Sequence, residues 1–376
     1  MQNQATINQE NISRHLCPSC GANAVFDPRN GQLTCPYCGF AQEIQAVGTI
    51  EERDYAAFFR NAAGNLQPMA REAMQVQCSS CGAIVIFTPP ETARDCDFCG
   101  AKIVAQPKSA DPTIAPEAVL PFKITDQQAV AALRSWFGSL WFAPSALKEF
   151  AQPDKIHSVY IPYWTYDSFA QSNYSGERGE HYYETEYYTE TDSDGKQQQR
   201  SRQVRHTRWY STSGQVQRQF DDVLIPATKS LTAKHLEELE PWDFEELKPY
   251  EPAYLAGHKA QTYQVALDEG FGRFQQIADN VIREDARQDI GGDEQRVHSV
   301  STDFQNITFK HLLLPVYAGA YRFNNKVFQI VVNGRTGEVQ GARPYSWIKI
   351  TLFVLAILAV LLIIIMVVGA IQLIRK

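Results

Sequence analysis

The chain has 376 residues, and its 35 lysines and arginines against 42 aspartates and glutamates give a formal net charge of −7. This length accommodates two or three domains, and 11% aromatic residues exclude a chain that is disordered throughout. The acidic balance argues against a dedicated nucleic-acid binder, which is usually basic. The charge is unevenly spread: residues 221–294 carry 7 basic and 17 acidic side chains, whereas residues 295–376 carry 9 and 2.

The cysteines form an internal repeat near the N-terminus. All eight lie in Cys-x-x-Cys pairs followed by glycine: Cys17/Cys20, Cys35/Cys38, Cys78/Cys81 and Cys96/Cys99. Fourteen residues separate the two pairs of each half, and the second half repeats the first 61 positions later. Two thiolates on one tight turn hold one face of a tetrahedral ion, so two turns supply four sulfurs. The spacing predicts two Cys₄ zinc ribbons, at residues 15–47 and 76–106. Each would hold one structural Zn²⁺, since the four sulfurs fill its coordination shell.

Two other readings of the cysteines remain open. Redox dithiols would need one pair near a βαβ unit and not four pairs in register. Disulfides would need an oxidising compartment, but residues 1–14, predicted to be a disordered N-terminus, contain no apolar run typical of a signal peptide. The ribbons carry no cluster of lysines and arginines, so protein contact is favoured over nucleic-acid contact.

Residues 48–75 predict a connecting helix between the ribbons. The helix would cover Thr49 to Ala63, with Thr49 and Glu52 as a capping box, and an apolar stripe that includes Phe58 and Phe59. It could pack between the ribbons or offer a docking surface, and packing is favoured. Residues 107–121, rich in proline and alanine, read as a linker.

Residues 122–344 predict an α+β domain with a largely antiparallel sheet. The domain opens with a capping box, Thr125 with Gln128, and a helix, followed by a strand at Lys155–Asp167. A long hairpin is expected at residues 176–214, turning at Ser193-Asp194-Gly195. This register places Glu186 opposite Arg202 and Glu180 opposite Arg208. The hairpin is either a solvated ribbon or, through its tyrosines, a surface for a partner.

The remainder of this domain alternates helices and strands. The pattern predicts short helices within Leu231–Leu247, a longer helix at Thr262–Arg287, strands at Val297–Ser301 and Thr308–Leu314, and a hairpin turning at Asn324-Asn325. Asn333-Gly334 and Thr336-Gly337 mark the next turn.

The C-terminus predicts a single transmembrane helix at residues 347–374. No charged residue lies between Ile350 and Ile374, and a helix of that length extends about 37 Å, more than the hydrocarbon core requires. Tyr345 and Trp347 fit the membrane interface. Five basic residues precede the span and two follow it: Arg322, Lys326, Arg335, Arg343 and Lys349, against Arg375 and Lys376. This asymmetry predicts N-terminal domains in the cytoplasm and an inner-membrane location.

Catalytic motifs are not found. The chain contains no Walker loop, dinucleotide fingerprint, nucleophile elbow or His-Glu-x-x-His, so the sequence predicts a protein that is not an enzyme. His311, within an apolar strand, is expected to be a satisfied core residue.

Several segments together resemble a known family. After the two Cys₄ ribbons come VLPFKITDQQAVAALRSWF, WFAPSALKEF, VYIPYWTYDS, LLLPVYAGAYRFNNKVFQIVVNGRTGEVQG and the apolar C-terminal helix. The chain is similar to bacterial double zinc-ribbon membrane proteins, often labelled replication factor Y or primosomal protein-like, although it has no helicase motor motif. The resemblance implies recruitment of phage-shock protein A or SPFH-type proteins to the membrane in envelope stress. Shorter relatives lack the charged hairpin at 176–214.

These observations predict a cytoplasmic scaffold that is anchored in the lipid bilayer and binds protein partners through its ribbons and α+β domain. The alternative is a membrane-tethered zinc-ribbon protein that binds nucleic acid.

Overall fold

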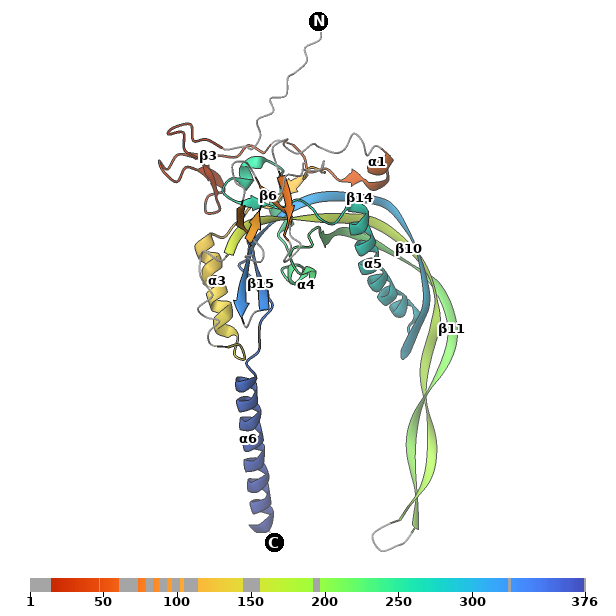
Figure 1. Ribbon diagram of the computed structural model, residues 1–376. Helices are drawn as coiled ribbons and strands as arrows, with labels where there is room; N and C mark the ends of the chain where they lie inside the picture. Colours follow the sequence, from red (N-terminus) through yellow and green to blue (C-terminus); the bar gives the residue numbers. More distant parts are fainter. Residues whose placement is uncertain are drawn as a thin grey trace.

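One long antiparallel sheet organises the molecule (Figure 1). The computed structural model describes residues 15–46, 48–60, 74–78, 84–87, 93–96, 102–104, 114–144, 156–191, 197–323 and 326–374. The main strands are β10 (Ile156–Thr191), β11 (Gln197–Pro226), β14 (Glu294–Phe323), β15 (Lys326–Asn333) and β16 (Val339–Gly341), in the order β11-β10-β14-β15-β16. Each of these neighbours is antiparallel, so the predicted largely antiparallel sheet is confirmed.

The strands are longer than the sequence predicts. β10 joins the expected strand at Lys155–Asp167 to the expected hairpin, and β14 joins the two strands expected at Val297–Ser301 and Thr308–Leu314. The polar residues between the predicted strands remain in the strand conformation because β10 is hydrogen-bonded there to both of its neighbours, β11 and β14. The predicted hairpin register is confirmed, with Glu186 opposite Arg202 and Glu180 opposite Arg208.

Bulges interrupt this ladder on both sides of β10, at Asp167 on the side of β11 and at Ser168 on the side of β14. Asp222 on β11 and Asn306 on β14 adopt positive φ angles of 47° and 51° close to them. Bulges bend strands and increase their twist, which accounts for the curvature of the sheet beyond this point in Figure 1.

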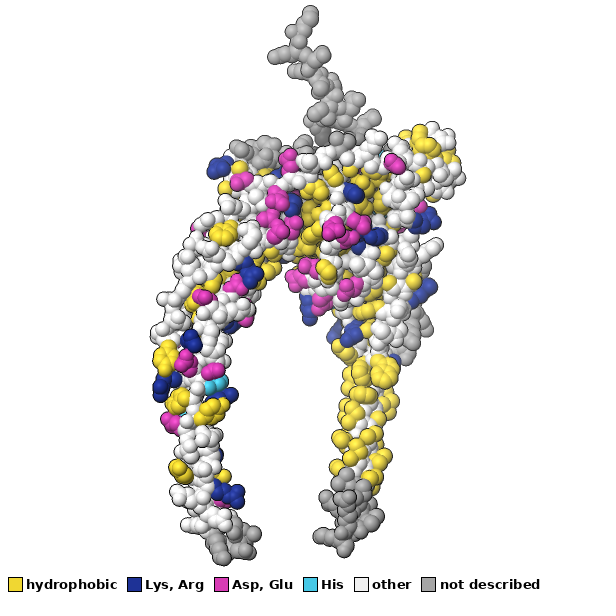
Figure 2. Space-filling view, turned by 180° about the vertical axis from the view of Figure 1, so that it is seen from behind, with side chains coloured by type: hydrophobic (Ala, Val, Ile, Leu, Met, Phe, Trp, Pro, Cys, Tyr) yellow, Lys and Arg dark blue, Asp and Glu magenta, His cyan; other side chains and the backbone are white. Residues whose placement is uncertain are grey.

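The far end of the sheet is a two-stranded arm. β14 begins at Glu294, opposite Gly179, and only β10 and β11 continue. We call residues 180–191 and 197–208 the distal arm. It extends to the same side of the domain as the C-terminal helix α6 (Trp347–Ile374) in both views (Figures 1 and 2).

Helices cover the sheet close to where the sequence places them. α3 (Asp126–Ser139) has the predicted capping box of Thr125 and Gln128. α5 (Leu267–Ile290) ends at Gly291 as expected but starts five residues later than predicted, because Ala266 is extended. The stretch Leu231–Leu247 holds α4 (Ala233–Glu237) and the 3₁₀ helix η3 (Phe244–Glu246).

The connection between the two cysteine sets is a correction to the prediction. Within the described residues helix α1 covers Tyr55–Arg60 and begins at Tyr55, not at Thr49. The Asp54 carboxylate accepts a hydrogen bond from its first turn, at the Ala57 amide. Strand β4 (Arg53–Asp54) precedes it and pairs with β14. Glu52 could not serve as a capping partner because its carboxylate binds Lys310 of the sheet.

The predicted linker at 107–121 also differs from the structure in its described part. Strand β9 (Ala118–Val119) is fully buried and pairs with β14 and with β12 (Lys248–Pro249). Proline and alanine suggested a linker, but Ala118 and Val119 lie between β14 and β12 and pair with both strands. Two further short elements, η4 (Pro252–Leu255) and β13 (Lys259–Ala260), complete this layer.

Aromatic residues of β10 form the centre of the core. Trp164, Tyr160, Tyr163 and Tyr166 are fully buried, and α5 packs against the sheet through a row of buried residues that includes Phe274. The indole of Trp164 and the hydroxyl of Tyr166 donate hydrogen bonds to the carbonyls of Val265 and Leu267, where α5 begins.

Replacing Phe274 with alanine is expected to destabilise the domain by about 3–5 kcal/mol, because a fully buried phenylalanine leaves a cavity. Ile277, 40% exposed on the same helix, is the matched control, and its replacement with alanine should cost less than about 1 kcal/mol. Urea unfolding of the detergent-solubilised chain, followed by tryptophan fluorescence, measures both values. Equal midpoints for the two variants would contradict this packing.

Helix α6 has the bounds that the sequence predicts. Within the described residues it is the one helix long and apolar enough to cross a membrane, and none of its apolar window is buried against the rest of the chain. Several predicted features lie outside the described residues: the disordered segment 1–14, the turns at 193–195 and 324–325, and the ligands Cys81 and Cys99.

Candidate metal centre

The first four cysteines sit on two turns with the same backbone geometry. The amide of Gly21 donates to the carbonyl of Cys17 over 2.8 Å, and the amide of Gly39 donates to that of Cys35 over 3.0 Å. Both glycines have a φ of 73°, a left-handed conformation that glycine adopts without strain. The two pairs therefore form two equivalent knuckles, held by the three-stranded sheet of β1 (Val25–Asp27), β2 (Gln32–Thr34) and β3 (Ala41–Gln42).

The four sulfurs converge at one point. All lie within 4.8 Å of one another, and the Sγ atoms of Cys17 and Cys38, and those of Cys20 and Cys35, are 3.5 Å apart. Sulfurs around a tetrahedral zinc ion, each about 2.3 Å from it, are separated by about 3.8 Å. Cys17 and Cys35 are buried while Cys20 and Cys38 are exposed, so this Cys₄ group can hold a metal ion close to the surface.

The electrostatics of the cluster favour a bound cation. Hydrogen bonds from the amides of Cys38 and Tyr37 lower the pKa of the Cys35 thiol to about 6. The pKa of Cys20 is raised to about 12, because the neighbouring thiols of Cys35 and Cys38 outweigh the lowering effect of the Ala22 amide. Four adjacent thiolates repel one another, and a divalent cation removes that repulsion.

The second cysteine set repeats the strand register of the first. The bridge Leu16–Asn23 and the pair Thr34–Ala41 of the first set correspond, 61 positions later, to Gln77–Ile84 and Asp95–Lys102. The strands are β5 (Met74–Gln77), β6 (Ile84–Phe87), β7 (Ala93–Asp95) and β8 (Lys102–Val104). Cys78 and Cys96 are buried, as are Cys17 and Cys35, and they belong to one core cluster with residues of the central sheet.

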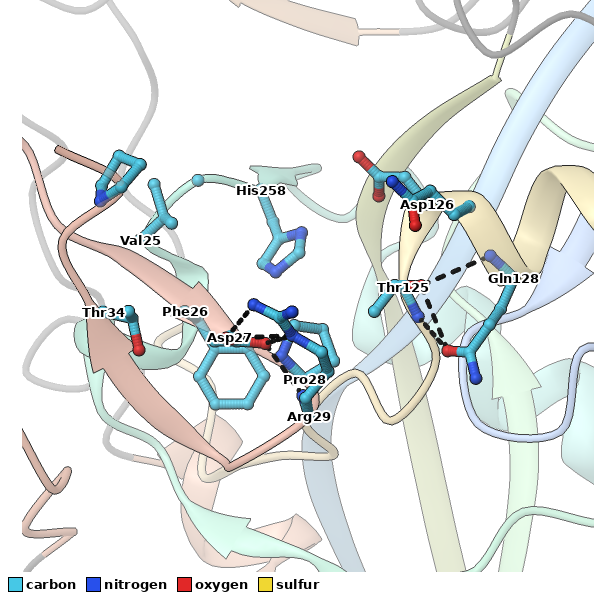
Figure 3. Close-up of a pocket in the computed structure, with 13 residues that line it drawn as sticks. Val25, Phe26, Asp27, Pro28, Arg29, Thr34, Thr125, Asp126, Gln128 and His258 are labelled. Atoms are coloured by element: carbon cyan, nitrogen blue, oxygen red, sulfur yellow. Dashed lines mark hydrogen bonds and ion pairs between the residues drawn. The ribbon is translucent and has the colours of Figure 1, made fainter. Parts of the chain in front are cut away.

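The first cysteine set is docked on the α+β domain through β1. The amide of Phe26 donates to the carbonyl of Ala256 over 2.8 Å, and Gly257 lies so close to Val25 that a Cβ there would be 2.9 Å from the valine Cβ. Beside this contact lies a cavity of about 660 Å³ between β1 and the start of α3 (Figure 3). His258 borders the cavity and stacks on Phe122, and burial lowers its pKa to about 4.

A buried charge network, which the sequence analysis missed, joins the connection at 48–60 to the sheet. Lys310 of β14 binds Glu52 over 3.0 Å and Asp222 over 2.6 Å. Arg53 binds Glu117 over 2.6 Å, while the His311 amide also donates to the Glu117 carboxylate. The sequence did contain a signal for this network: Lys310 lies in the largely apolar segment Ile307–Pro315. A lysine that is buried with such a segment requires acidic partners.

His311 itself is buried, and its Nδ1 lies 3.0 Å from the carbonyl oxygen of Ile114. Burial lowers its pKa to about 4, so the ring is neutral at physiological pH. The predicted burial is confirmed, but the ring is only partly satisfied, because its Nε2 is buried with no hydrogen-bond partner among the described residues.

Burial raises the pKa of Glu117 from 4.5 to about 7, against the lowering effect of Arg53. The folded chain therefore binds a proton more tightly than the unfolded chain, and this group's contribution to stability falls as pH rises from about 4.5 to about 7. Between pH 5.5 and 8 we expect the loss to be about 2 kcal/mol. Glu117→Gln should abolish it, as measured by urea unfolding at both pH values, and a variant with the wild-type pH profile would contradict the assignment.

Comparisons with known proteins found one similar protein that matches most of the chain. No protein-family model and no solved structure matches the chain. The chain is 29% identical over 353 residues to a Bacillus subtilis (strain 168) protein described as "Uncharacterized protein YdjG", and the match covers 92% of this chain and 94% of that protein. The similarity therefore extends over nearly all of both proteins.

Proposed function

We propose that this protein is a membrane-anchored scaffold that holds two zinc ribbons at the cytoplasmic face of the inner membrane, where they bind protein partners. The observation that carries the proposal is that one folded domain supports both a convergent Cys₄ cluster and an exposed apolar helix of membrane-spanning length. Four cysteine ligands complete a zinc coordination shell and leave no position for a substrate. The zinc therefore stabilises a binding module. The part of the proposal that the protein is not an enzyme is supported by the lack of catalytic motifs in its sequence.

Two zinc ions per chain are part of the proposal. The support for the second ion is the repeated strand register together with the buried positions of Cys78 and Cys96. Its complete ligand set would be Cys78, Cys81, Cys96 and Cys99. Both ions are structural, because a ribbon of this size buries too little apolar surface to fold without metal.

The cytoplasmic orientation rests on the charges next to the helix. Arg335, one of the five basic residues that precede the uncharged stretch Ile350–Ile374, is buried and binds Asp243 and Glu246, so it belongs to the domain interior. Arg343 lies four residues before α6 and Lys349 lies in its first turn, and basic residues at that end of a span favour the cytoplasmic side.

Two surfaces are available to partners. One is the exposed face of the first ribbon, where Tyr37 is 82% and Phe40 39% exposed. The other is the distal arm, where Tyr183 and Tyr187 are exposed and Arg202 lies over the ring of Tyr188. The family resemblance proposes phage-shock protein A or SPFH-type proteins as partners, in an envelope-stress response.

Crosslinking of the full chain in native membranes, followed by identification of the neighbours, tests this function. We expect one or a few proteins whose recovery is lost when Cys35 is replaced by serine, because that variant should lose the first ribbon. A Ser19→Ala variant, altered at an exposed position within the same knuckle, should recover them at wild-type levels. Recovery that is unaffected by Cys35→Ser would show that the ribbon is not the binding surface.

A further inference from the structure

The loop after α3 is attached to the beginning of the apolar helix. The ring centroids of Phe142 and Phe353 are 5.3 Å apart, and those of Trp141 and Phe353 are 6.4 Å apart. The amide of Ser346 donates to the carbonyl of Phe142 over 2.6 Å, and Lys349 Nζ donates to that of Ala143 over 2.7 Å. These contacts hold the loop beside the first turns of α6.

The position of Phe353 sets the depth of this loop relative to α6. Phe353 follows Trp347 by six residues, which is about 9 Å along a helix. If Tyr345 and Trp347 mark the interface, the Phe353 ring lies in the upper part of the hydrocarbon. Side chains that touch this ring from the loop must then lie at the level of the bilayer surface or below it.

The loop and the start of α6 expose large aromatic side chains, as segments at a membrane interface do. Trp141 is 78% exposed, Tyr345 62% and Trp347 74%, so three large aromatic residues surround the beginning of α6. Tryptophan and tyrosine favour the headgroup level of a bilayer because they combine an apolar ring with a polar group. The apolar surface of α6 continues onto the base of the domain, where lysine and arginine side chains gather (Figure 2).

Polar groups suited to headgroups surround the same loop. A cavity of about 180 Å³ is lined by residues of the loop, by Arg343 and by Tyr345. The guanidinium of Arg343 lies 5.6 Å from the ring centroid of Tyr345. Basic groups next to aromatic residues match the anionic headgroups of the cytoplasmic leaflet.

We propose that Trp141 and Phe142 insert into the interfacial region of the phospholipid bilayer beside α6, as a second membrane contact. This inference rests on the proposed anchoring by α6. Two contacts fix the orientation of the domain on the membrane, which a single helix cannot do because it can rotate about its own axis. The loop thereby determines which face of the ribbons and of the arm is presented to partners.

The distal arm is not part of this membrane contact, and its charged residues must stay out of the bilayer. It extends to the same side of the domain as α6 (Figure 1), and it carries charged pairs such as Glu186–Arg202 and Glu190–Arg200, which hydrocarbon excludes. The arm therefore has to lie outside the hydrocarbon when α6 spans the membrane, and β14 no longer pairs with it beyond Gly179.

Fluorescence quenching by brominated lipids tests the insertion. The full chain is reconstituted into phosphatidylcholine–phosphatidylglycerol vesicles with bromines either near the headgroup or deep in the acyl chains. Trp347→Phe removes the tryptophan of α6, and Trp347→Phe/Trp141→Phe removes both. The difference between these variants is the signal of Trp141. We expect Trp347→Phe to be quenched more strongly by shallow than by deep bromines, and the double variant to lose more than about half of that quenching.

Equal quenching of the two variants would overturn the proposal. A third variant, Trp141→Phe, keeps Trp347 and reports on α6 alone. Flotation of the vesicles on a density gradient shows whether each variant is bound to them. If Trp141→Phe floats and its Trp347 is quenched, while Trp141 is not quenched in Trp347→Phe, the loop does not insert but α6 still anchors the chain. If the chain does not float, both the insertion of the loop and the anchoring by α6 are wrong. Unchanged zinc content and circular dichroism in all variants show that each is folded, as conservative changes at exposed side chains should be.

Discussion

Cys35→Ser is expected to lower the zinc content from two ions per chain to one and to unfold the first ribbon. Cys35 is buried and its sulfur faces that of Cys20 across the cluster, so a hydroxyl there removes one of four thiolate ligands from the centre. Structural zinc contributes about 10–16 kcal/mol to the folding of small zinc domains, far more than such a ribbon gains from its own core. Metal analysis of the purified chain measures the stoichiometry.

The controls separate the two ribbons. Cys96→Ser should also leave one ion per chain, and Cys35→Ser/Cys96→Ser should leave none. Ser19→Ala, adjacent to the ligand Cys20 but exposed, should keep both ions. In each variant the α+β domain should remain folded, since its core is made by β10, β14 and α5. A chain that binds no metal and nevertheless folds in residues 15–46 would refute the zinc assignment.

Three lysines in the middle of α6 are expected to release the protein from membranes. Each charge at the centre of a span costs about 3 kcal/mol, so Leu358→Lys/Leu361→Lys/Leu362→Lys together oppose insertion by about 9 kcal/mol. All three leucines are about half exposed or more and touch no core, so the folded domain should be unaffected. Membranes washed with alkaline carbonate and then sedimented show whether the chain remains associated.

The same three positions provide the control. Leu358→Ala/Leu361→Ala/Leu362→Ala shortens the side chains but adds no charge, and it should resist the carbonate wash as the unmodified chain does. If the lysine variant also stays with the membrane and keeps both zinc ions, α6 is not what anchors the protein.

Local patterns predicted the elements whose signal lies within a few residues. The capping box of Thr125 and Gln128, the register of Glu186 opposite Arg202, and the end of α5 at Gly291 are all set by neighbours in sequence or by one turn. The knuckle spacing likewise brought Cys17, Cys20, Cys35 and Cys38 together, as their sulfurs confirm. For the second set, two ligands lie outside the described residues. The bound zinc ion stays a prediction at both sets.

The mistakes have a common physical cause, which is that strands are stabilised by partners far away in the sequence. Thr49 and Glu52 match a capping box, but Glu52 gains more from Lys310, 258 residues away, and the helix begins at Tyr55. Residues 114–121 look like part of a linker, but the sheet edge on β14 and the chain at Lys248 turn Ala118 and Val119 into a buried strand.

The sequence by itself determined the eight candidate ligands, the apolar helix at 347–374 and the antiparallel character of the sheet, because each depends on spacing, composition or alternation along the chain. Only the tertiary structure decided how these parts are combined. In the structure the separately predicted strands are continuous in β10 and β14. The connection at 48–60 is bound to the sheet by ion pairs with Lys310 and Glu117. The loop of Trp141 and Phe142 packs against α6. Contacts of this kind form between residues distant in sequence, and their energies depend on burial that no local pattern records.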